Sequence, residues 1–126
     1  GVKDIRLIAP KDLLPEDVAN LPVHVFSDLN EGLHNVDVVI TLRMQKERMV
    51  EKAVMDKESF YNKYGLNKEN LALAKSTAIV MHPGPMNRDC EISSVVADGP
   101  QSVILQQAKN GVFARMAILA RAFNML

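Results

Sequence analysis

The chain has 126 residues, 48% of them hydrophobic, and its 15 basic and 15 acidic side chains give a formal net charge of 0. That length supports one domain with a modest core. The balanced charge excludes a general binder of nucleic acids or membrane surfaces, which needs a basic excess. The single cysteine, Cys90, excludes an intrachain disulfide and favours a reducing cytoplasm. No apolar run is long enough to span a bilayer, and no signal peptide is apparent.

Along the first 35 residues, short apolar runs alternate with helix signals. In chain order, the expected elements are a strand at 5–9, a short helix from 15–18, a strand at 23–26 and a helix at 29–34. Pro10 stops the first strand, because proline cannot donate to a ladder. Ser27 or Asp28 supplies the oxygen that caps the helix after the second strand. The pattern predicts a strand–helix alternation from the start of the chain.

The same alternation continues to the end of the chain. The expected elements are a strand at 36–42, helices at 56–64 and 68–75, a strand at 78–81 and a long helix at 101–123. Asp56 and Asn67 are the expected caps. The nearly continuous apolar character of residues 36–42 predicts a parallel strand covered on both faces. Together the elements predict an α/β fold, with three α/β/α layers around a mainly parallel sheet.

The predicted helix at 101–123 has apolar residues at helical spacing along one side, which is typical of a helix that packs on a core. These residues are Val103, Ala114, Ile118 and Ala122. Gly111 is a weak point in this helix, costing about 1 kcal/mol relative to alanine.

Two unusual segments directly follow predicted strands. Residues 43–48 come after the strand at 36–42, and residues 82–88 come after the strand at 78–81. Ligands of open parallel sheets bind beyond the carboxyl ends of the strands. We therefore expect these two segments to form the functional site.

The first segment is rich in groups that bind anions. Arg43 and Arg48 have planar guanidinium groups suited to carboxylate or phosphate, while Gln45 adds a neutral amide and Lys46 a point charge. Together they suit a small dianionic ligand. The alternative is a solvated charged loop in which Glu47 pairs with Arg43 or Arg48.

The second segment is stiff. Pro83 and Pro85 fix φ and lack amide hydrogens, so the loop around Gly84 presents carbonyl oxygens that could accept hydrogen bonds from a ligand NH2 group. The alternative is a rigid turn with no ligand. His82 could act as a base, although an orienting or core histidine is the commoner role.

Three segments of the chain match one family in the same order: TLRMQKER at 41–48, MHPGPMNR at 81–88 and QQAKNGVFARMA at 106–117. Over its whole length, 1–126, the chain resembles the C-terminal, aspartate-binding domain of the aspartate carbamoyltransferase catalytic chain. The resemblance implies transfer of the carbamoyl group of carbamoyl phosphate to L-aspartate, in cytoplasmic pyrimidine biosynthesis. It also implies a homo-oligomer, a trimer in the full enzyme.

The resemblance also implies roles for individual residues. Arg43 and Gln45 match residues that bind L-aspartate. The backbone at Pro83, Gly84 and Pro85 matches the loop that contacts the carbamoyl group. Three further residues, which match positions that organise the loops, are Glu47, Arg48 and Arg88, and Glu47 and Arg88 could pair across the two loops.

No catalytic nucleophile, metal or cofactor is expected from the resemblance, because this acyl transfer depends on positioning and charge stabilisation. The three histidines, His24, His34 and His82, lack ligand-like spacing. Ornithine-specific relatives would carry a different substrate loop and a His-Cys-Leu-Pro segment. The HPGP sequence at 82–85 therefore favours aspartate.

The resemblance begins late in the family's sequence. It leaves out the carbamoyl-phosphate domain with its phosphate loop, and the first strand of the aspartate domain, which lies centrally in the family's sheet. We therefore expect 1–126 to be a partial domain, inactive alone, whose unpaired strand edges promote self-association. Two alternatives are a structural or regulatory remnant that assembles with intact catalytic chains, and a small carboxylate-binding module.

Overall fold

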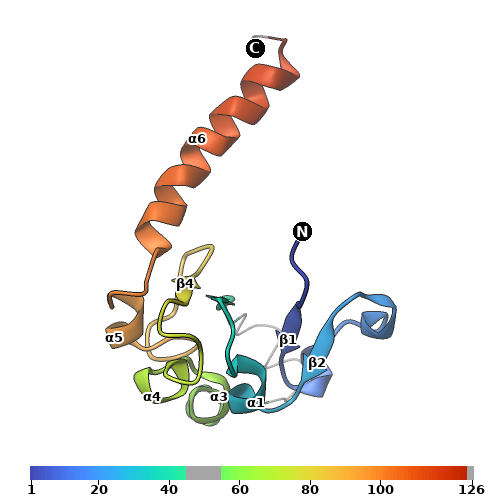
Figure 1. The fold of residues 1–126 in the computed structure, drawn as a ribbon, viewed down its shortest axis with the longest axis vertical. Coiled ribbons are helices and arrows are strands. Elements are labelled where there is room, and N and C mark those ends of the chain that lie inside the picture. The colour runs from blue at the N-terminus through green and yellow to red at the C-terminus, as the bar shows by residue number, and fades with distance from the viewer. Residues whose placement is uncertain (45–54, 125–126) are drawn as a thin grey trace.

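The computed structural model describes residues 1–44 and 55–124 (Figure 1). The strands are β1 (Arg6–Ile8), β2 (His24–Phe26), β3 (Val38–Ile40) and β4 (Ile79–Met81). The α-helices are α1 (Leu29–Leu33), α3 (Lys57–Tyr64), α4 (Lys68–Leu71), α5 (Ser94–Ala97) and α6 (Ile104–Ala122), and the 3-10 helices are η1 (Lys11–Leu13) and η2 (Val18–Asn20). Among the described residues, none of the helices combines the length and the hydrophobicity that a membrane-spanning helix needs.

The strands pair in parallel, which confirms the predicted α/β class. β1 pairs with β2 in the register Arg6↔His24, and β3 pairs with β4 in the register Ile40↔Met81. Each pair forms its own two-stranded sheet, and in the described part of the chain no ladder joins the two sheets. The helical segments between paired strands supply the crossovers that parallel pairing requires.

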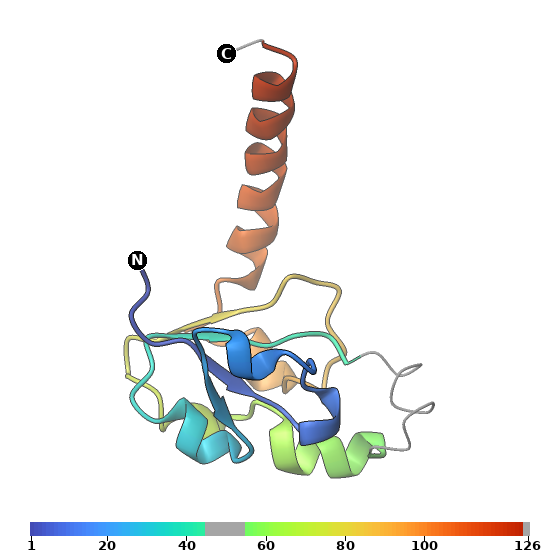
Figure 2. The same ribbon diagram turned by 90° about the vertical axis from the view of Figure 1, so that its right-hand side faces the viewer.

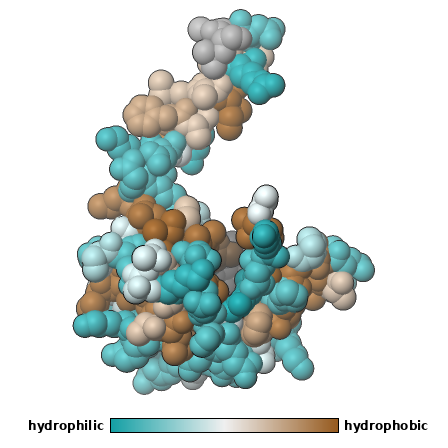
Figure 3. Space-filling view, in the orientation of Figure 1, coloured by the Kyte–Doolittle hydropathy of each residue, from teal (hydrophilic) through white to brown (hydrophobic). Residues whose placement is uncertain are grey.

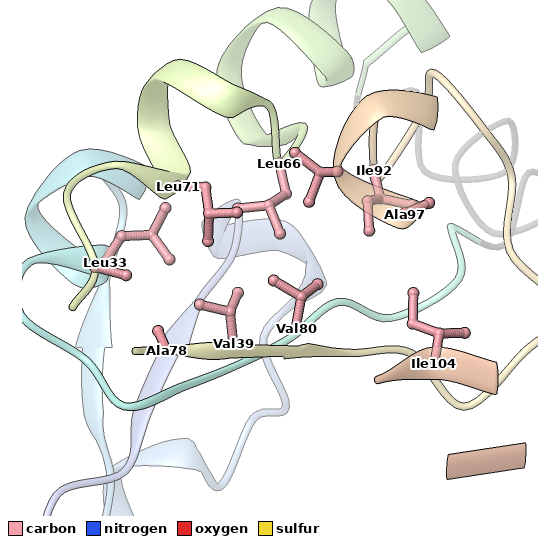
Figure 4. Close-up of a cluster of buried hydrophobic side chains, with 11 residues drawn as sticks. Leu33, Val39, Leu66, Leu71, Ala78, Val80, Ile92, Ala97 and Ile104 are labelled. Atoms are coloured by element: carbon pink, nitrogen blue, oxygen red, sulfur yellow. The ribbon is translucent and has the colours of Figure 1, made fainter. Parts of the chain in front are cut away.

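The core lies between the β3–β4 sheet and the short helices beside it (Figure 4). Its buried side chains come from β3 and β4, from α1, α4 and α5, from the first turn of α6 and from the segments that connect these elements: Leu33, Val39, Leu66, Leu71, Ala74, Ala78, Val80, Ile92, Val96, Ala97 and Ile104. Helices α1, α3 and α4 gather on one side of the strands (Figure 1). The strand alternation therefore places one face of β3 and β4 in the core.

The prediction that residues 36–42 form a strand covered on both faces is wrong. Val39 is 8% exposed, whereas Val38 and Ile40 on the opposite face are 45% and 57% exposed. β4 repeats the pattern, with Val80 fully buried and Ile79 37% exposed. The second face has apolar residues but no covering layer in the described chain.

The predicted helix caps are confirmed at three positions. Asp28 accepts hydrogen bonds from the amides of Asn30 and Glu31, and Asp56 accepts from the amide of Ser59. Asn67 and Asn70 form a reciprocal capping box at the start of α4. α4 ends at Leu71 rather than 75, because the chain tightens into a turn in which the amide of Ala74 donates to the carbonyl of Leu71.

Helix α6 projects away from the rest of the described chain (Figure 2). Ile104 in its first turn is its only fully buried residue, although apolar side chains recur along the helix (Figure 3). Those that are more than half exposed are Leu105, Val112, Phe113, Met116, Ile118 and Leu119. The predicted apolar periodicity is present, but the expectation that it packs on this chain's core is wrong.

We expect opposite effects when two glycines are replaced by alanine. A Cβ at Gly65 would lie 2.6 Å from the carbonyl oxygen of Tyr61, so Gly65→Ala should lower the free energy of unfolding by about 1–3 kcal/mol. A Cβ at Gly111 would meet only the end of Arg115, at 3.8 Å, so Gly111→Ala should stabilise α6 by about 1 kcal/mol. Urea unfolding of both variants measures the difference. Equal effects at the two positions would contradict this packing.

We also expect the chain to self-associate with rising concentration, because exposed apolar residues on α6 and on β3 favour contact with another surface. Sedimentation velocity at increasing concentration measures this, and Met116→Lys with Leu119→Lys should weaken it. Lys109→Arg, on the same helix, is a control that keeps the charge. A monomer at all concentrations would overturn the expectation.

Candidate functional site

The two predicted segments begin side by side, because β3 and β4 are paired in parallel. The amide of Thr41 donates to the carbonyl of Met81 at 3.0 Å, one residue beyond the last pair of the ladder. The chain then leaves β3 toward Arg43 and leaves β4 toward His82. Both segments therefore start at the same edge of the sheet, as the sequence pattern predicts.

Arg43 lies in the first of these segments, and its side chain is exposed. Among the described residues none forms an ion pair with it. The next residue, Met44, is 7% exposed and packs with Cys90, Met55 and Phe60. A buried anchor thus directly follows an exposed guanidinium. Gln45, Glu47 and Arg48 lie outside the described residues, so their predicted roles remain predictions.

The second segment forms an exposed turn. Pro83, Gly84 and Pro85 are all exposed, and the Gly84–Pro85 peptide bond is cis. Gly84 has a φ of 71°, in the left-handed region that glycine adopts without the steric cost of a Cβ. Nothing lies within 4 Å of the position that a Cβ would take. The turn therefore keeps its outer side free for a ligand.

His82 does not face solvent at the site. Its side chain is buried, its Nε2 lies 3.1 Å from Oε1 of Glu91, and its Nδ1 accepts a hydrogen bond of 2.8 Å from the amide of Gly84. Both ring nitrogens are therefore occupied within the protein. This arrangement fits the orienting role and not that of a base in contact with a substrate.

Polar contacts join the two segments to each other. The amide of Met44 donates to Oε2 of Glu91 at 3.4 Å, and Nδ2 of Asn87 donates to the carbonyl of Met44 at 3.3 Å. Glu91 and Asn87 were not identified from the sequence. The one available signal was the placement of a charged residue between Cys90 and Ile92, two residue types that proteins often bury.

Arg88 pairs with Asp98 at the end of α5. Its two terminal nitrogens donate to the two carboxylate oxygens at 2.7 and 2.9 Å. These hydrogen bonds raise the pKa of the Arg88 guanidinium and lower the pKa of the Asp98 carboxyl. Arg88 therefore ties its loop to α5, while the suggested contact with Glu47 lies outside the described residues.

One hollow on the surface of the described residues does not coincide with these segments. It has a volume of about 410 Å³ and is lined by residues of α1, α3 and α4 and their flanks: Asn30, Asn62, Asn67, Glu69, Asn70 and Leu73. None of the predicted site residues lines it. Within the described residues no group of three His, Cys, Asp or Glu side chains is arranged to hold a metal ion. We place the candidate site at the strand ends because the exposed Arg43 and the exposed turn at 83–85 follow the neighbouring ends of β3 and β4.

The arrangement combines one cationic group with a surface that accepts hydrogen bonds. The guanidinium of Arg43 suits a carboxylate. The turn at 83–85 offers carbonyl oxygens, because its two prolines have no amide hydrogen and the amide of Gly84 is used by His82. A ligand with a carboxylate at one end and an NH2 group at the other would match both.

Comparison with known proteins identifies relatives over nearly the whole chain. Residues 3–122 match the family model described as aspartate/ornithine carbamoyltransferase, Asp/Orn binding domain. Aspartate transcarbamoylase from Trypanosoma cruzi, solved in complex with carbamoyl phosphate, is 32% identical with a TM-score of 0.76, over 93% of this chain and 39% of that one.

Ornithine carbamoyltransferases are also similar. The enzyme from Burkholderia thailandensis is 27% identical with a TM-score of 0.75, over 93% of this chain and 38% of that one. The enzyme from Pyrococcus furiosus is 23% identical with a TM-score of 0.79, over 93% of this chain and 41% of that one, and this likeness bears on the fold alone. The chain thus spans about two-fifths of the length of each of these three solved structures. By its match over residues 3–122, it belongs to the aspartate/ornithine carbamoyltransferase family, as an Asp/Orn binding domain.

Proposed function

We propose that this chain is the amino-acid-binding part of an aspartate carbamoyltransferase, which transfers the carbamoyl group of carbamoyl phosphate to L-aspartate. The observation that carries the proposal is the exposed guanidinium of Arg43, at the edge of the sheet where the carbonyl-rich turn at 83–85 also begins. Arg43 would bind a carboxylate of aspartate, with Gln45 beside it. The turn would accept hydrogen bonds from the carbamoyl NH2 group.

Charge favours aspartate over ornithine as the amino acid. The side chain of ornithine is cationic, and the segment 43–48 carries three basic residues and one acidic residue. Like charges at close range repel, whereas a carboxylate gains charge-assisted hydrogen bonds from a guanidinium. The HPGP sequence at 82–85 and the 32% identity to an aspartate transcarbamoylase support the same choice.

In the proposed reaction the amine of aspartate attacks the carbonyl carbon of carbamoyl phosphate. A tetrahedral intermediate forms, the bond between the carbonyl carbon and the phosphate oxygen breaks, and phosphate leaves, taking up the proton that the amine loses. The residues of this chain would hold the amine donor and orient the carbamoyl group, so that the reacting atoms meet at a productive distance. A second part of the enzyme would hold the phosphate and would also make the remaining contacts to aspartate. The complete enzyme is proposed to be a cytoplasmic homo-oligomer.

We expect the chain to bind dicarboxylates weakly and to discriminate against ornithine. Titration of 15N-labelled protein with L-aspartate or succinate should shift the amide signals near Arg43, and L-ornithine should leave them in place. Arg43→Ala should weaken binding by about 10- to 100-fold, since hydrogen bonds to charged groups contribute about 1.5–3 kcal/mol. Arg115→Ala, which removes an exposed arginine on α6, is the matched control. Ornithine binding as tight as that of aspartate would refute the choice of substrate.

We expect no carbamoyl-aspartate formation by the 126-residue chain alone. The proposed phosphate contacts belong to another part of the enzyme, so leaving-group stabilisation is lost. Incubation with carbamoyl phosphate and L-aspartate, followed by product analysis, tests this against a full-length aspartate transcarbamoylase as a positive control. Product formation at a rate near that of the control would disprove the expectation.

A further inference from the structure

One buried carboxylate lies between the two segments of the candidate site. Glu91 is 3% exposed and is flanked in sequence by Cys90 and Ile92, which are both fully buried. Removing a carboxylate from water is costly unless its oxygens receive hydrogen bonds. The donors that satisfy Glu91 therefore indicate which parts of the chain it holds together.

The donors come from both segments of the site. Oε1 of Glu91 receives a hydrogen bond from the amide of Asn87 and lies 3.1 Å from Nε2 of His82, both in the segment after β4. Oε2 receives a longer hydrogen bond, 3.4 Å, from the amide of Met44 in the segment after β3. One side chain thus joins the end of β3 to the end of β4 beyond their last ladder pair.

The contacts of His82 determine which of its ring nitrogens carries the hydrogen. The amide of Gly84 can only donate, so Nδ1, which lies 2.8 Å from it, must accept. Nδ1 therefore has no hydrogen, and the hydrogen on Nε2 is donated to Glu91. A doubly protonated imidazolium paired with Glu91 is excluded by the same contact, because its Nδ1 could not accept.

This tautomer has a consequence for the turn at 83–85. The amide of Gly84 is the only one in that turn, and His82 uses it. The outer surface of the turn consequently offers carbonyl oxygens alone. Glu91 fixes His82, and His82 in turn fixes the hydrogen-bonding character of the surface that would meet an NH2 group.

Met44 is fixed on several sides, and it directly follows Arg43. Its amide donates to Glu91, its carbonyl accepts from Asn87, and its sulfur lies 3.8 Å from the thiol of Cys90. The contact with Glu91 therefore restrains the backbone from which the Arg43 side chain extends. Loss of this contact would therefore leave the position of Arg43 relative to the turn less restrained, although Arg43 itself is unchanged.

We propose that Glu91 is a positioning residue that couples the two substrate segments: through Met44 it sets the place of Arg43, and through His82 it fixes the acceptor surface at residues 83–85. The relevance of this role to catalysis rests on the proposed function. The coupling itself is a property of the free chain and can be measured without any substrate.

The variant Glu91→Gln tests the coupling, because an amide has one acceptor oxygen where the carboxylate has two. The oxygen is expected to stay with the two donors at His82 and Asn87, which leaves the NH2 group facing the amide of Met44. Hydrogen exchange at Met44 should then accelerate by about tenfold or more, while exchange in the β1–β2 sheet stays unchanged. Glu58→Gln, at an exposed position on α3, is the matched control and should change neither.

A second measurement does not depend on the stability of any variant. The 15N chemical shifts of the His82 ring in the unmodified chain should identify the tautomer with hydrogen on Nε2. Hydrogen on Nδ1, or on both nitrogens, would overturn the proposal, as would unchanged exchange at Met44 in a folded Glu91→Gln chain.

Titration of the same samples with L-aspartate separates this inference from the proposed function. Weaker aspartate binding in Glu91→Gln, with unchanged binding in Glu58→Gln, is the expected result, although Glu91 touches no ligand. Equal aspartate affinity of the two variants would overturn the positioning role. Absence of aspartate binding to the unmodified chain would count against the proposed function, while Met44 exchange would still decide the coupling.

Discussion

Parallel pairing of β3 with β4 is the constraint on which the candidate site depends. Parallel strands that pair in register end at the same edge, so the segments after Ile40 and Met81 begin as neighbours. In sequence, 38 residues (41–78) separate β3 from β4, yet the carboxyl ends of the two strands lie side by side. Any change that shifted this register would separate Arg43 from the turn at 83–85, even with every site residue present.

Beyond the end of the ladder, side chains replace backbone pairing. Glu91 and Asn87 bond to Met44, and Arg88 bonds to Asp98, so the loop after β4 is tied both to its neighbour and to α5. Because Glu91 is buried, the loss of one donor would leave a carboxylate oxygen unsatisfied and would destabilise the fold. The exposed Arg88–Asp98 pair is weaker in this sense, since water can replace either partner. The buried network therefore defines the geometry of the site, and the exposed pair supports it.

His82 illustrates how a conspicuous residue can act indirectly. A histidine at the end of a strand suggests acid–base chemistry, yet its ring lies inside the protein with both nitrogens engaged. Its backbone amide also donates to the side chain of Gln107 at 3.0 Å, which links the start of the loop to the first turn of α6. His82 thus connects the turn at 83–85, Glu91 and helix α6. These contacts indicate that it orients the turn and does not react with a substrate.

Local signals in the sequence predicted much of the fold. Asp28, Asp56 and Asn67 act as helix caps because capping depends on residues only two or three positions away. The strand positions followed from short apolar runs, and the placement of the two segments followed from the order of strands and helices. Motif resemblance added the family, which the match over residues 3–122 supports.

Features that depend on distant contacts were not predictable in this way. The exposure of Val38 and Ile40 depends on whether a second layer covers β3, and their apolar character cannot reveal that. The projection of α6 could not be predicted for the same reason. Its apolar periodicity is typical of a helix that packs on another surface, but it does not show which surface that is. Glu91 was missed because its role comes from donors 4, 9 and 47 residues away, and α5 because four residues are too few to give a periodic pattern.

We propose that the two segments bind one ligand between them, with a carboxylate at Arg43 and an NH2 group at the turn. A crystal structure of the chain with N-carbamoyl-L-aspartate tests this most directly. The account predicts a carboxylate within about 3 Å of the Arg43 guanidinium and the carbamoyl NH2 group at hydrogen-bond distance from carbonyl oxygens of residues 83–85. A ligand bound in the hollow beside α4, or held by Arg43 with its carbamoyl group turned away from the turn, would contradict it.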